Sequence, residues 1–480
     1  MARALLPAAP RLVSALGIIS GVLGQMTNRP LRISHVGVRG VVGPGLTAAH
    51  VLDFGAAFGT FLPPRSTVIL GRDTRASGAM IREGILASLT ACSHNVIDLG
   101  IVSTPIVQHA IRDHNAHGGL SIGASHNAAD WNALKFFGPD GTYLSTAESS
   151  ELLDIYHLGK YSYVPYDKLG SLRHDPTALE AYLDELAAAY DFDSLRRFRV
   201  VVDCCNGTSS LILRRLNERF GFAFILINER IEPRLFAHDP TTNAATVALQ
   251  LSPLILPLEA DAGFLFDADS DRIALATERG EAVSEELILP LIADWILPLS
   301  EGKLVITNLS STSLVEEVGR RHRARVVRVP VGRQAAMDAL ASYRPEQIAL
   351  AGEGTGAVMM ARFRFIYDGI ASMFAILSMM RQRAQRISEI VASYPRYSML
   401  KGQVPLVSTR IPQLLMDLRR DYSDGILNLT DGLRVDWPGK WFHVRAAQTE
   451  PIVRVIVEQR GDSPVALFQE LMEKVAEISV

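Results

Sequence analysis

The sequence predicts an α/β fold: three related α/β domains with mixed sheets, followed by a C-terminal α+β domain, arranged around a central cleft. Strand-like runs alternate with helical patterns of about 10–15 residues along the middle of the chain, which is typical of βαβ units. These units recur about every 100 residues, although no exact internal repeat is visible. From about residue 396 the pattern changes to antiparallel strands. No low-complexity linker separates the parts, so we expect tightly packed domains.

Each of the three α/β units combines a strand, a helix and a second strand. We expect the strands at 66–70, 95–100, 197–204, 222–229, 302–308 and 324–330, and the helices between them at 78–92, 209–221 and 313–322. The corresponding domains are expected at 30–175, 176–281 and 282–395, with the fourth at 396–480.

The fourth domain has the alternating pattern of an antiparallel sheet. Its strands are expected within 425–437, 440–447 and 452–459, with turns at Asp431-Gly432 and Pro438-Gly439. The run from 463 to 478 has a helical pattern and closes the domain.

Composition, charge and cysteine spacing limit the class of protein and the kinds of partner that we expect. Hydrophobic residues make up 48% of the chain and charged residues 21%, as in globular proteins. A formal net charge of −3 gives no electrostatic reason to expect a nucleic-acid partner. The three cysteines, Cys92, Cys204 and Cys205, lack metal-ligand spacing. We expect reduced thiols and a cytoplasmic location.

The first 29 residues are expected to lie outside the fold. Arg3 and Arg11 precede a weakly apolar run of 14 residues, Leu12 to Gln25, which is too short to span a bilayer. A loosely signal-like segment is one interpretation. The other, which we favour, is a non-native upstream start, with Met26 beginning the functional chain. We expect no membrane partner.

Ser125 lies in the polar stretch Ser-Ile-Gly-Ala-Ser-His-Asn, residues 121–127. A serine between Ala124 and His126 could close a turn, and it could also be a nucleophile or a phosphate carrier. The stretch alone favours the turn.

Three carboxylates alternate in Phe-Asp-Ala-Asp-Ser-Asp-Arg. On an extended backbone, Asp267, Asp269 and Asp271 would project to one side. Three such groups repel one another unless a cation lies among them, and oxygen ligands favour Mg²⁺. An EF-hand calcium loop is disfavoured because Arg272 occupies the position that needs glycine, although Glu278 falls at its twelfth position. A solvated acidic loop is the remaining alternative.

Two further loops contain groups that suit a sugar phosphate. Glu353 and Thr355 lie among the glycines of 348–360, whose spacing differs from a dinucleotide-binding fingerprint. Such a loop suits hydrogen bonds to sugar hydroxyls, and a plain tight turn fits equally well. In the stretch 444–455, Arg445, Gln448 and Thr449 offer donors suited to a phosphate.

In this order, the four stretches resemble the α-D-phosphohexomutase family over about residues 31–480. Further matches to the family's motifs are Gly-Val-Arg-Gly (37–40), Gly-Arg-Asp-Thr-Arg-Ala-Ser-Gly (71–78), Thr-Pro (104–105), Asp-Cys-Cys-Asn-Gly-Thr (203–208) and Val-Pro-Val-Gly (329–332). The resemblance implies the four-domain fold around a cleft, one Mg²⁺ per chain, and hexose phosphate and bisphosphate substrates. It implies a monomer or a homodimer.

The resemblance also implies roles position by position. Ser125 would carry the transferable phosphoryl group and, with Asp267, Asp269 and Asp271, would hold Mg²⁺. Lys135, Arg39 and His126 would be catalytic, with nearby cations lowering the pKa of Lys135 so that it can transfer protons. The substrate would be bound by Arg272, Glu353, Thr355, Arg445, Gln448, Thr449 and Arg454.

The sequence departs from the family pattern at three of these loops. Ala128 replaces a proline, Ala357 a histidine present in many members, and Ala447-Gln448 a serine-asparagine pair. We expect an enzyme that interconverts hexose 6-phosphate and hexose 1-phosphate through a phosphoserine and a bisphosphate, with glucosamine phosphate as the first choice of substrate. A phosphomannomutase or phosphoglucomutase, and a mutase-derived binding protein, are the alternatives.

Overall fold

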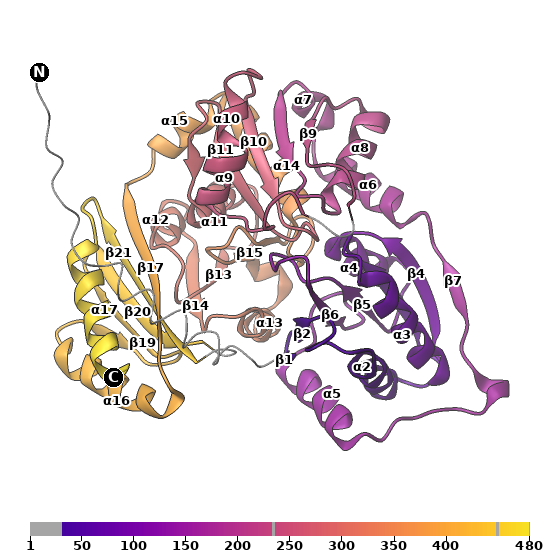
Figure 1. Ribbon diagram of the computed structural model, residues 1–480. Coiled ribbons are helices and arrows are strands. Elements are labelled where there is room, and N and C mark those ends of the chain that lie inside the picture. Colours follow the sequence, from indigo (N-terminus) through magenta and orange to yellow (C-terminus); the bar gives the residue numbers. More distant parts are fainter. Residues whose placement is uncertain (1–30, 233–235, 448–450, 480) are drawn as a thin grey trace, which may run out of the picture.

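The chain builds four sheets in sequence order, each the centre of one domain (Figure 1). The computed structural model describes residues 31–232, 236–447 and 451–479. The expected N-terminal extension, residues 1–29, therefore lies outside the described residues, as do Gln448 and Thr449. The fold class predicted from the sequence is confirmed: three mixed sheets precede one antiparallel sheet.

The first sheet has parallel strands at one edge and antiparallel strands at the other. Its order is β1 (Leu31–Ser34), β2 (Gly37–Val41), β6 (Trp131–Phe137), β5 (Gly118–Ile122), β3 (Thr67–Arg72), β4 (Asn95–Ile101) and β7 (Leu172–His174). Its helices are α2 (Ala48–Phe61), α3 (Gly78–Ala91), α4 (Thr104–Asp113) and α5 (Thr146–Leu158). Helices α2, α3 and α5 share one apolar cluster with the sheet, whereas α4 belongs to a larger one.

The second sheet carries the acidic loop. Its order is β12 (Ala282–Val283), β11 (Ile273–Thr277), β10 (Ala262–Phe266), β8 (Val200–Asp203) and β9 (Ile225–Ile227), so it continues two residues past the limit expected at 281. Its helices are α6 (Ala178–Ala189), α7 (Phe192–Leu195), α8 (Ser209–Phe220), α9 (Ala244–Gln250) and α10 (Ser252–Ile255).

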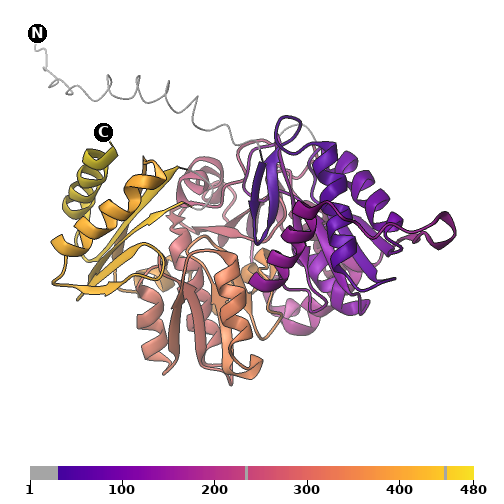
Figure 2. The same ribbon diagram turned by 90° about the horizontal axis from the view of Figure 1, so that it is seen from below.

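The third sheet lies between the first and the fourth in two views (Figures 1 and 2). Its order is β14 (Arg325–Val329), β13 (Leu304–Asn308), β15 (Ile348–Gly352) and β16 (Val358–Met360). Its helices are α11 (Ile288–Ile296), α12 (Leu314–Arg321), α13 (Arg333–Ala341), α14 (Gly369–Arg383) and α15 (Ile387–Ala392). Short 3₁₀ turns elsewhere are η1 (Tyr166–Lys168), η2 (Glu285–Leu287), η3 (Pro345–Gln347) and η4 (Ser408–Arg410).

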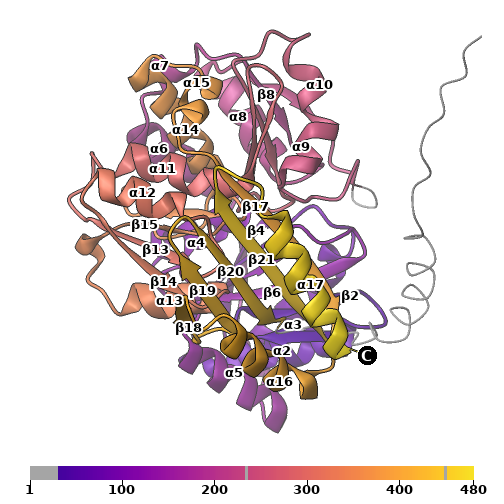
Figure 3. The same cartoon turned by 90° about the vertical axis from the view of Figure 1, so that its left-hand side faces the viewer.

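The fourth sheet is antiparallel and carries two helices on one face (Figure 3). Its order is β17 (Tyr397–Pro405), β21 (Ile452–Arg460), β20 (Lys440–Ala446), β19 (Leu433–Trp437) and β18 (Ile426–Asn428), with α16 (Ile411–Asp421) and α17 (Val465–Ser479). Gly432 and Gly439 take φ values of 76° and 73°, which confirms the two predicted turns.

Apolar packing divides the molecule differently from the sheets. One cluster of buried residues runs from Ile69 to Tyr394 and joins the first three domains, whereas the fourth has a cluster of its own, from Leu406 to Val475. No helix among the described residues combines the length and apolar character needed to cross a bilayer.

Candidate active site

Ser125 lies in the loop that joins β5 to β6, and its backbone is in the left-handed region with φ of 49°. This region is uncommon for a residue with a side chain and is held only where the surroundings determine it. The serine is buried, and its Oγ donates a hydrogen bond of 2.5 Å to Asp267 Oδ2, in another domain. The serine does lie in a turn, as one interpretation of the sequence expected. A turn alone does not account for it, however, because its side chain also faces the acidic loop.

Arg75, in the loop after β3, binds the backbone of the serine loop, residues 123–131. Its Nη2 donates to the carbonyl oxygens of Ser125 (3.0 Å) and Asn127 (2.7 Å), and its Nη1 to those of Ala128 and Trp131 (3.1 Å). Its Nε is paired with Asp73 Oδ2 at 3.0 Å. All five N–H groups of one buried guanidinium are thus used.

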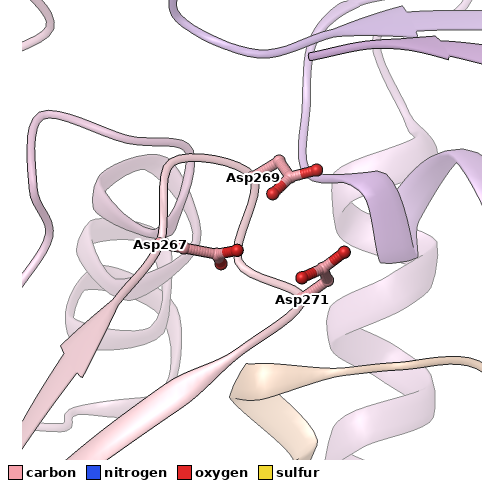
Figure 4. Close-up of side chains that lie close together, drawn as sticks. All are labelled: Asp267, Asp269 and Asp271. Atoms are coloured by element: carbon pink, nitrogen blue, oxygen red, sulfur yellow. The ribbon is translucent and has the colours of Figure 1, made fainter. Parts of the chain in front are cut away.

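The acidic loop joins β10 to β11 and turns the three carboxylates toward one another (Figure 4). One ligand atom from each of Asp267, Asp269 and Asp271 lies within 4.8 Å of the others. Each aspartate is at most 1% exposed, which excludes a solvated acidic loop. The strands on both sides exclude an EF-hand, and Glu278 instead accepts hydrogen bonds from Ser388.

The carboxylates converge for a different reason from the one expected. β10 ends at Phe266, so the triad lies in a turn, where Ser270 has φ of 62°. The period-2 argument from an extended strand is therefore wrong, although the cluster it predicted is present.

Two cations pair with one oxygen each of Asp269 and Asp271. Lys135 Nζ contacts Asp269 Oδ2 and lies 3.4 Å from Asp271 Oδ2, and Arg333 Nη2 lies 2.7 Å from Asp271 Oδ2. The other oxygens, Asp269 Oδ1 and Asp271 Oδ1, are buried and accept no hydrogen bond within the described residues. The nearest recorded charge to Asp271 Oδ1 is Arg272 Nε, at 3.6 Å. Buried carboxylate oxygens left in this way fit a hard divalent cation.

The pKa values of the triad follow from burial and these neighbours. Burial, followed by the charges of Asp271 and Asp269, raises the pKa of Asp267 well above its ordinary value. For Asp271 burial acts in the same direction, but Arg333 and Lys135 outweigh it and lower the pKa. The negative charge is therefore shared unevenly between Asp267 and Asp271, and a bound cation would reduce the repulsion among the three carboxylates.

Lys135 differs from the sequence-based expectation. Burial lowers its pKa, but the charge of Asp269, with contributions from Tyr143 and Asp271, raises it above the ordinary value. The expected lowering by nearby cations is wrong because the nearest charges are carboxylates. His126 shows the opposite effect: the charge of Arg272, then burial and Arg39, lowers its pKa to about 2. Its Nδ1 is 3.4 Å from Ser125 Oγ.

The glycine loop between β15 and β16 packs on the acidic loop. A Cβ on Gly356, whose φ is 81°, would lie 2.0 Å from the carbonyl oxygen of Ile273, so a side chain has no room there. Glu353 Oε1 and Thr355 Oγ1 are buried without a hydrogen-bond partner within the described residues. Buried polar atoms without a partner are uncommon in proteins, and these two remain available to bond a ligand.

The fourth loop is described only in part. Arg445 on β20 lies opposite Arg454 on β21, and its Nε donates to Asp431 Oδ2 at 2.9 Å. The same Asp431 oxygen accepts from the backbone N–H of Val331, two residues before Arg333. Arg39 lies on β2 beside Ala133 of β6, within the first domain.

Sequence reasoning missed four residues of the site. Thr104 donates to Asp269 Oδ2 at 2.6 Å, and Arg75 and Arg333 make the contacts above. All three lie in or directly after stretches matched to the family, which was a usable indication. Tyr367 had none. It is 1% exposed, its ring centre lies 4.8 Å from the Arg333 guanidinium, and its hydroxyl has no partner within the described residues.

Known proteins resemble this chain over most of its length. Three family models match in order, described as the alpha/beta/alpha domains I, II and III of phosphoglucomutase/phosphomannomutase, at residues 33–161, 180–280 and 285–397. A phosphoglucomutase/phosphomannomutase from Thermococcus kodakarensis is 28% identical over 453 residues, covering 92% of this chain and 97% of that protein.

A second protein of T. kodakarensis, a probable phosphoglucosamine mutase, is 30% identical over 447 residues, covering 91% of this chain and 96% of that protein. Among solved structures, a phosphoglucomutase/phosphomannomutase family protein from Burkholderia thailandensis superposes with a TM-score of 0.78 at 22% identity. The superposition covers 93% of this chain and 97% of that one, and supports the fold.

Proposed function

This chain belongs to the phosphoglucomutase/phosphomannomutase family and is a phosphohexomutase, and we propose that its substrate is glucosamine phosphate. In this proposal the enzyme moves a phosphoryl group between O6 and O1 of the hexose. Ser125 carries the group, and the sugar passes through a bound 1,6-bisphosphate.

The observation that carries the proposal is the contact between Ser125 Oγ and Asp267 Oδ2, 2.5 Å across a domain boundary. A serine used only as a turn residue needs no such partner. A serine that exchanges a phosphoryl group needs cations beside it, because negative charge builds up on the transferring oxygens. Lys135 and Arg333 supply positive charge at the same carboxylate cluster.

Each half-reaction transfers one phosphoryl group. Phosphorylated Ser125 gives its group to the free O1 or O6 hydroxyl of a hexose monophosphate: the new P–O bond to the sugar forms as the P–Oγ bond of the serine breaks, and the proton lost by the sugar hydroxyl is matched by one gained at the serine oxygen. The bisphosphate then reorients, and its other phosphoryl group passes to Ser125 Oγ: the P–O bond to the sugar breaks, the serine hydroxyl loses its proton and the sugar oxygen gains one. Glu353 and Thr355 are proposed to hold the sugar hydroxyls in both orientations, since their orphaned atoms can accept and donate. Arg445 and Arg454 are proposed to hold the non-reacting phosphate, together with Gln448 and Thr449.

Asp267, Asp269 and Asp271, with the serine oxygen, are proposed to hold one Mg²⁺. When bound, this ion would neutralise charge on the transferring phosphoryl group. Because Lys135 remains protonated beside two carboxylates, we propose that it acts as a fixed cation at this position and not as a base.

Glucosamine phosphate is favoured by the relative named probable phosphoglucosamine mutase, which is 30% identical. The relative named phosphoglucomutase/phosphomannomutase, at 28%, keeps mannose and glucose phosphates as the alternative. The three cysteines are free and buried, which suits a reducing compartment, so we propose a cytoplasmic location.

The test is a side-by-side assay of glucosamine, mannose and glucose 1-phosphates, combined with the intact mass of the purified protein. We expect a single phosphate adduct and the highest kcat/KM with glucosamine 1-phosphate. A higher kcat/KM with another sugar would change the proposed substrate but not the proposed reaction. Absence of both the adduct and turnover would favour the mutase-derived binding protein.

A further inference from the structure

We propose that Arg75 is a positioning residue that keeps the phosphoryl-carrying serine in its left-handed backbone conformation. The inference rests on the proposed role of Ser125. It adds a buried residue whose hydrogen bonds and ion pair go to the serine loop and to Asp73, and that would act on the reaction through the serine loop.

The Arg75 side chain makes most of its hydrogen bonds to the serine loop. Four of the five N–H groups of Arg75 are donated to carbonyl oxygens of a single short loop, residues 125–131. These carbonyls converge on a single guanidinium plane, so their directions are fixed together. Backbone conformation is what determines carbonyl direction, and the clamp therefore constrains φ and ψ of the loop, including Ser125.

The Arg75 side chain, which clamps the loop, is itself held in place by Asp73 and its neighbours. The Nε pairs with Asp73 Oδ2, and Asp73 Oδ1 accepts from the backbone N–H of Arg75 at 3.0 Å. Gly123, at the start of the serine loop, lies against Asp73: a Cβ there would be 2.8 Å from the carboxylate. The ring of Phe236, from the second domain, lies 4.9 Å from the guanidinium. The pair is buried on all of these sides and has few alternative conformations.

The pattern of hydrogen bonds requires a guanidinium group. Lysine offers three donors on one nitrogen and cannot bond carbonyls along the edges of a plane, so arginine is required for this pattern. The structure contains a second arginine–aspartate pair that does not touch the serine loop: the half-buried Arg82 on α3, whose Nε and Nη2 donate to the buried Asp98 Oδ2 at 2.9 and 2.6 Å. Arg82 thus offers a matched control within the same domain.

The experiment measures how fast Ser125 becomes phosphorylated. Dephosphorylated wild type, Arg75→Lys, Arg75→Ala and Arg82→Ala are mixed with glucose 1,6-bisphosphate, and the phosphate adduct is followed by intact mass. A misplacement of about 1 Å can reduce a rate about 10²-fold. We therefore expect Arg75→Ala to react about 10²-fold more slowly, Arg75→Lys at least about tenfold more slowly, and Arg82→Ala within about threefold of wild type.

Guanidinium ion at millimolar concentration, far below denaturing levels, should restore part of the rate of Arg75→Ala and leave Arg82→Ala unchanged. Circular dichroism and thermal unfolding establish that each variant is folded; if Arg75→Ala is not, Arg75→Lys decides the question. The inference is overturned if the Arg75 variants react at the wild-type rate, or if Arg82→Ala loses as much. Failure of the proposed function is distinct, because then the wild type itself would form no adduct.

Discussion

Replacing Tyr367 by phenylalanine should stabilise the folded protein. The hydroxyl is buried and has no hydrogen-bond partner within the described residues, and an unsatisfied group of this kind costs about 1–3 kcal/mol. The ring contact with the Arg333 guanidinium, 4.8 Å from the ring centre, does not need the hydroxyl. We therefore expect the free energy of unfolding to rise by about 1–2 kcal/mol. The same change should lower kcat/KM, because the ring packs on Arg333, which pairs with Asp271 of the acidic loop, and the unpartnered hydroxyl is available to a ligand.

The assay is urea unfolding of Tyr367→Phe beside Tyr182→Phe. Tyr182 is also fully buried, but its hydroxyl donates to Asp368 at 2.9 Å. Its loss should lower the free energy of unfolding by about 0.5–1.5 kcal/mol. The same chemical change should therefore raise the free energy of unfolding in Tyr367→Phe and lower it in Tyr182→Phe. If Tyr367→Phe is destabilised as much as Tyr182→Phe, the hydroxyl has a partner in the native protein and the reasoning fails.

Other expected outcomes follow from the same site and from one buried carboxylate. Ser125→Ala should show no phosphate adduct in its intact mass and no turnover, with an unchanged circular dichroism spectrum; normal turnover would refute the carrier. Chelation should abolish activity, and Asp269→Asn should bind Mg²⁺ more weakly in calorimetry; full activity after exhaustive chelation would contradict this. Lys135→Ala should lower kcat about 10²–10³-fold, the effect of removing one fixed donor, with Mg²⁺ still required. Burial opposes ionisation of Asp294, but hydrogen bonds from Tyr394, Arg383 and His322 lower its pKa to about 2. This contribution to stability is present above about pH 4 and is lost toward pH 2, so Asp294→Asn should flatten the pH dependence of the unfolding midpoint in that range.

Local patterns in the sequence were enough to predict several of the strands and the acidic cluster. Strand β8 and helix α8 follow from an apolar run and a 3.6-residue period, and these depend only on neighbours in the chain. The cluster of Asp267, Asp269 and Asp271 was also predictable, because residues so close in sequence are close in space whatever the backbone does. The reason given was nevertheless wrong, since a turn and not a pleat brings them together.

Contacts between domains could not be predicted in this way. Arg333 follows Asp271 by 62 positions, and no period or motif indicates that the two are paired. The pKa of Lys135 shows the same limit: its direction depends on which charges surround the ammonium group, and these come from another domain. The unpartnered hydroxyl of Tyr367 is equally a property of the assembled molecule.

The continuous apolar cluster of the first three domains has a consequence for how the chain folds during synthesis. Helix α14 (Gly369–Arg383) is buried along most of its length and contacts β11 and α7 of the second domain. β11 ends at Thr277, so the ribosome must add 91 more residues before α14 begins, which takes about 5–18 s at about 5–20 residues per second. Throughout that interval the second domain lacks part of its own interior. The second domain therefore has its own sheet but does not fold independently of the third. A fragment that ends at residue 281 should aggregate or recruit a chaperone.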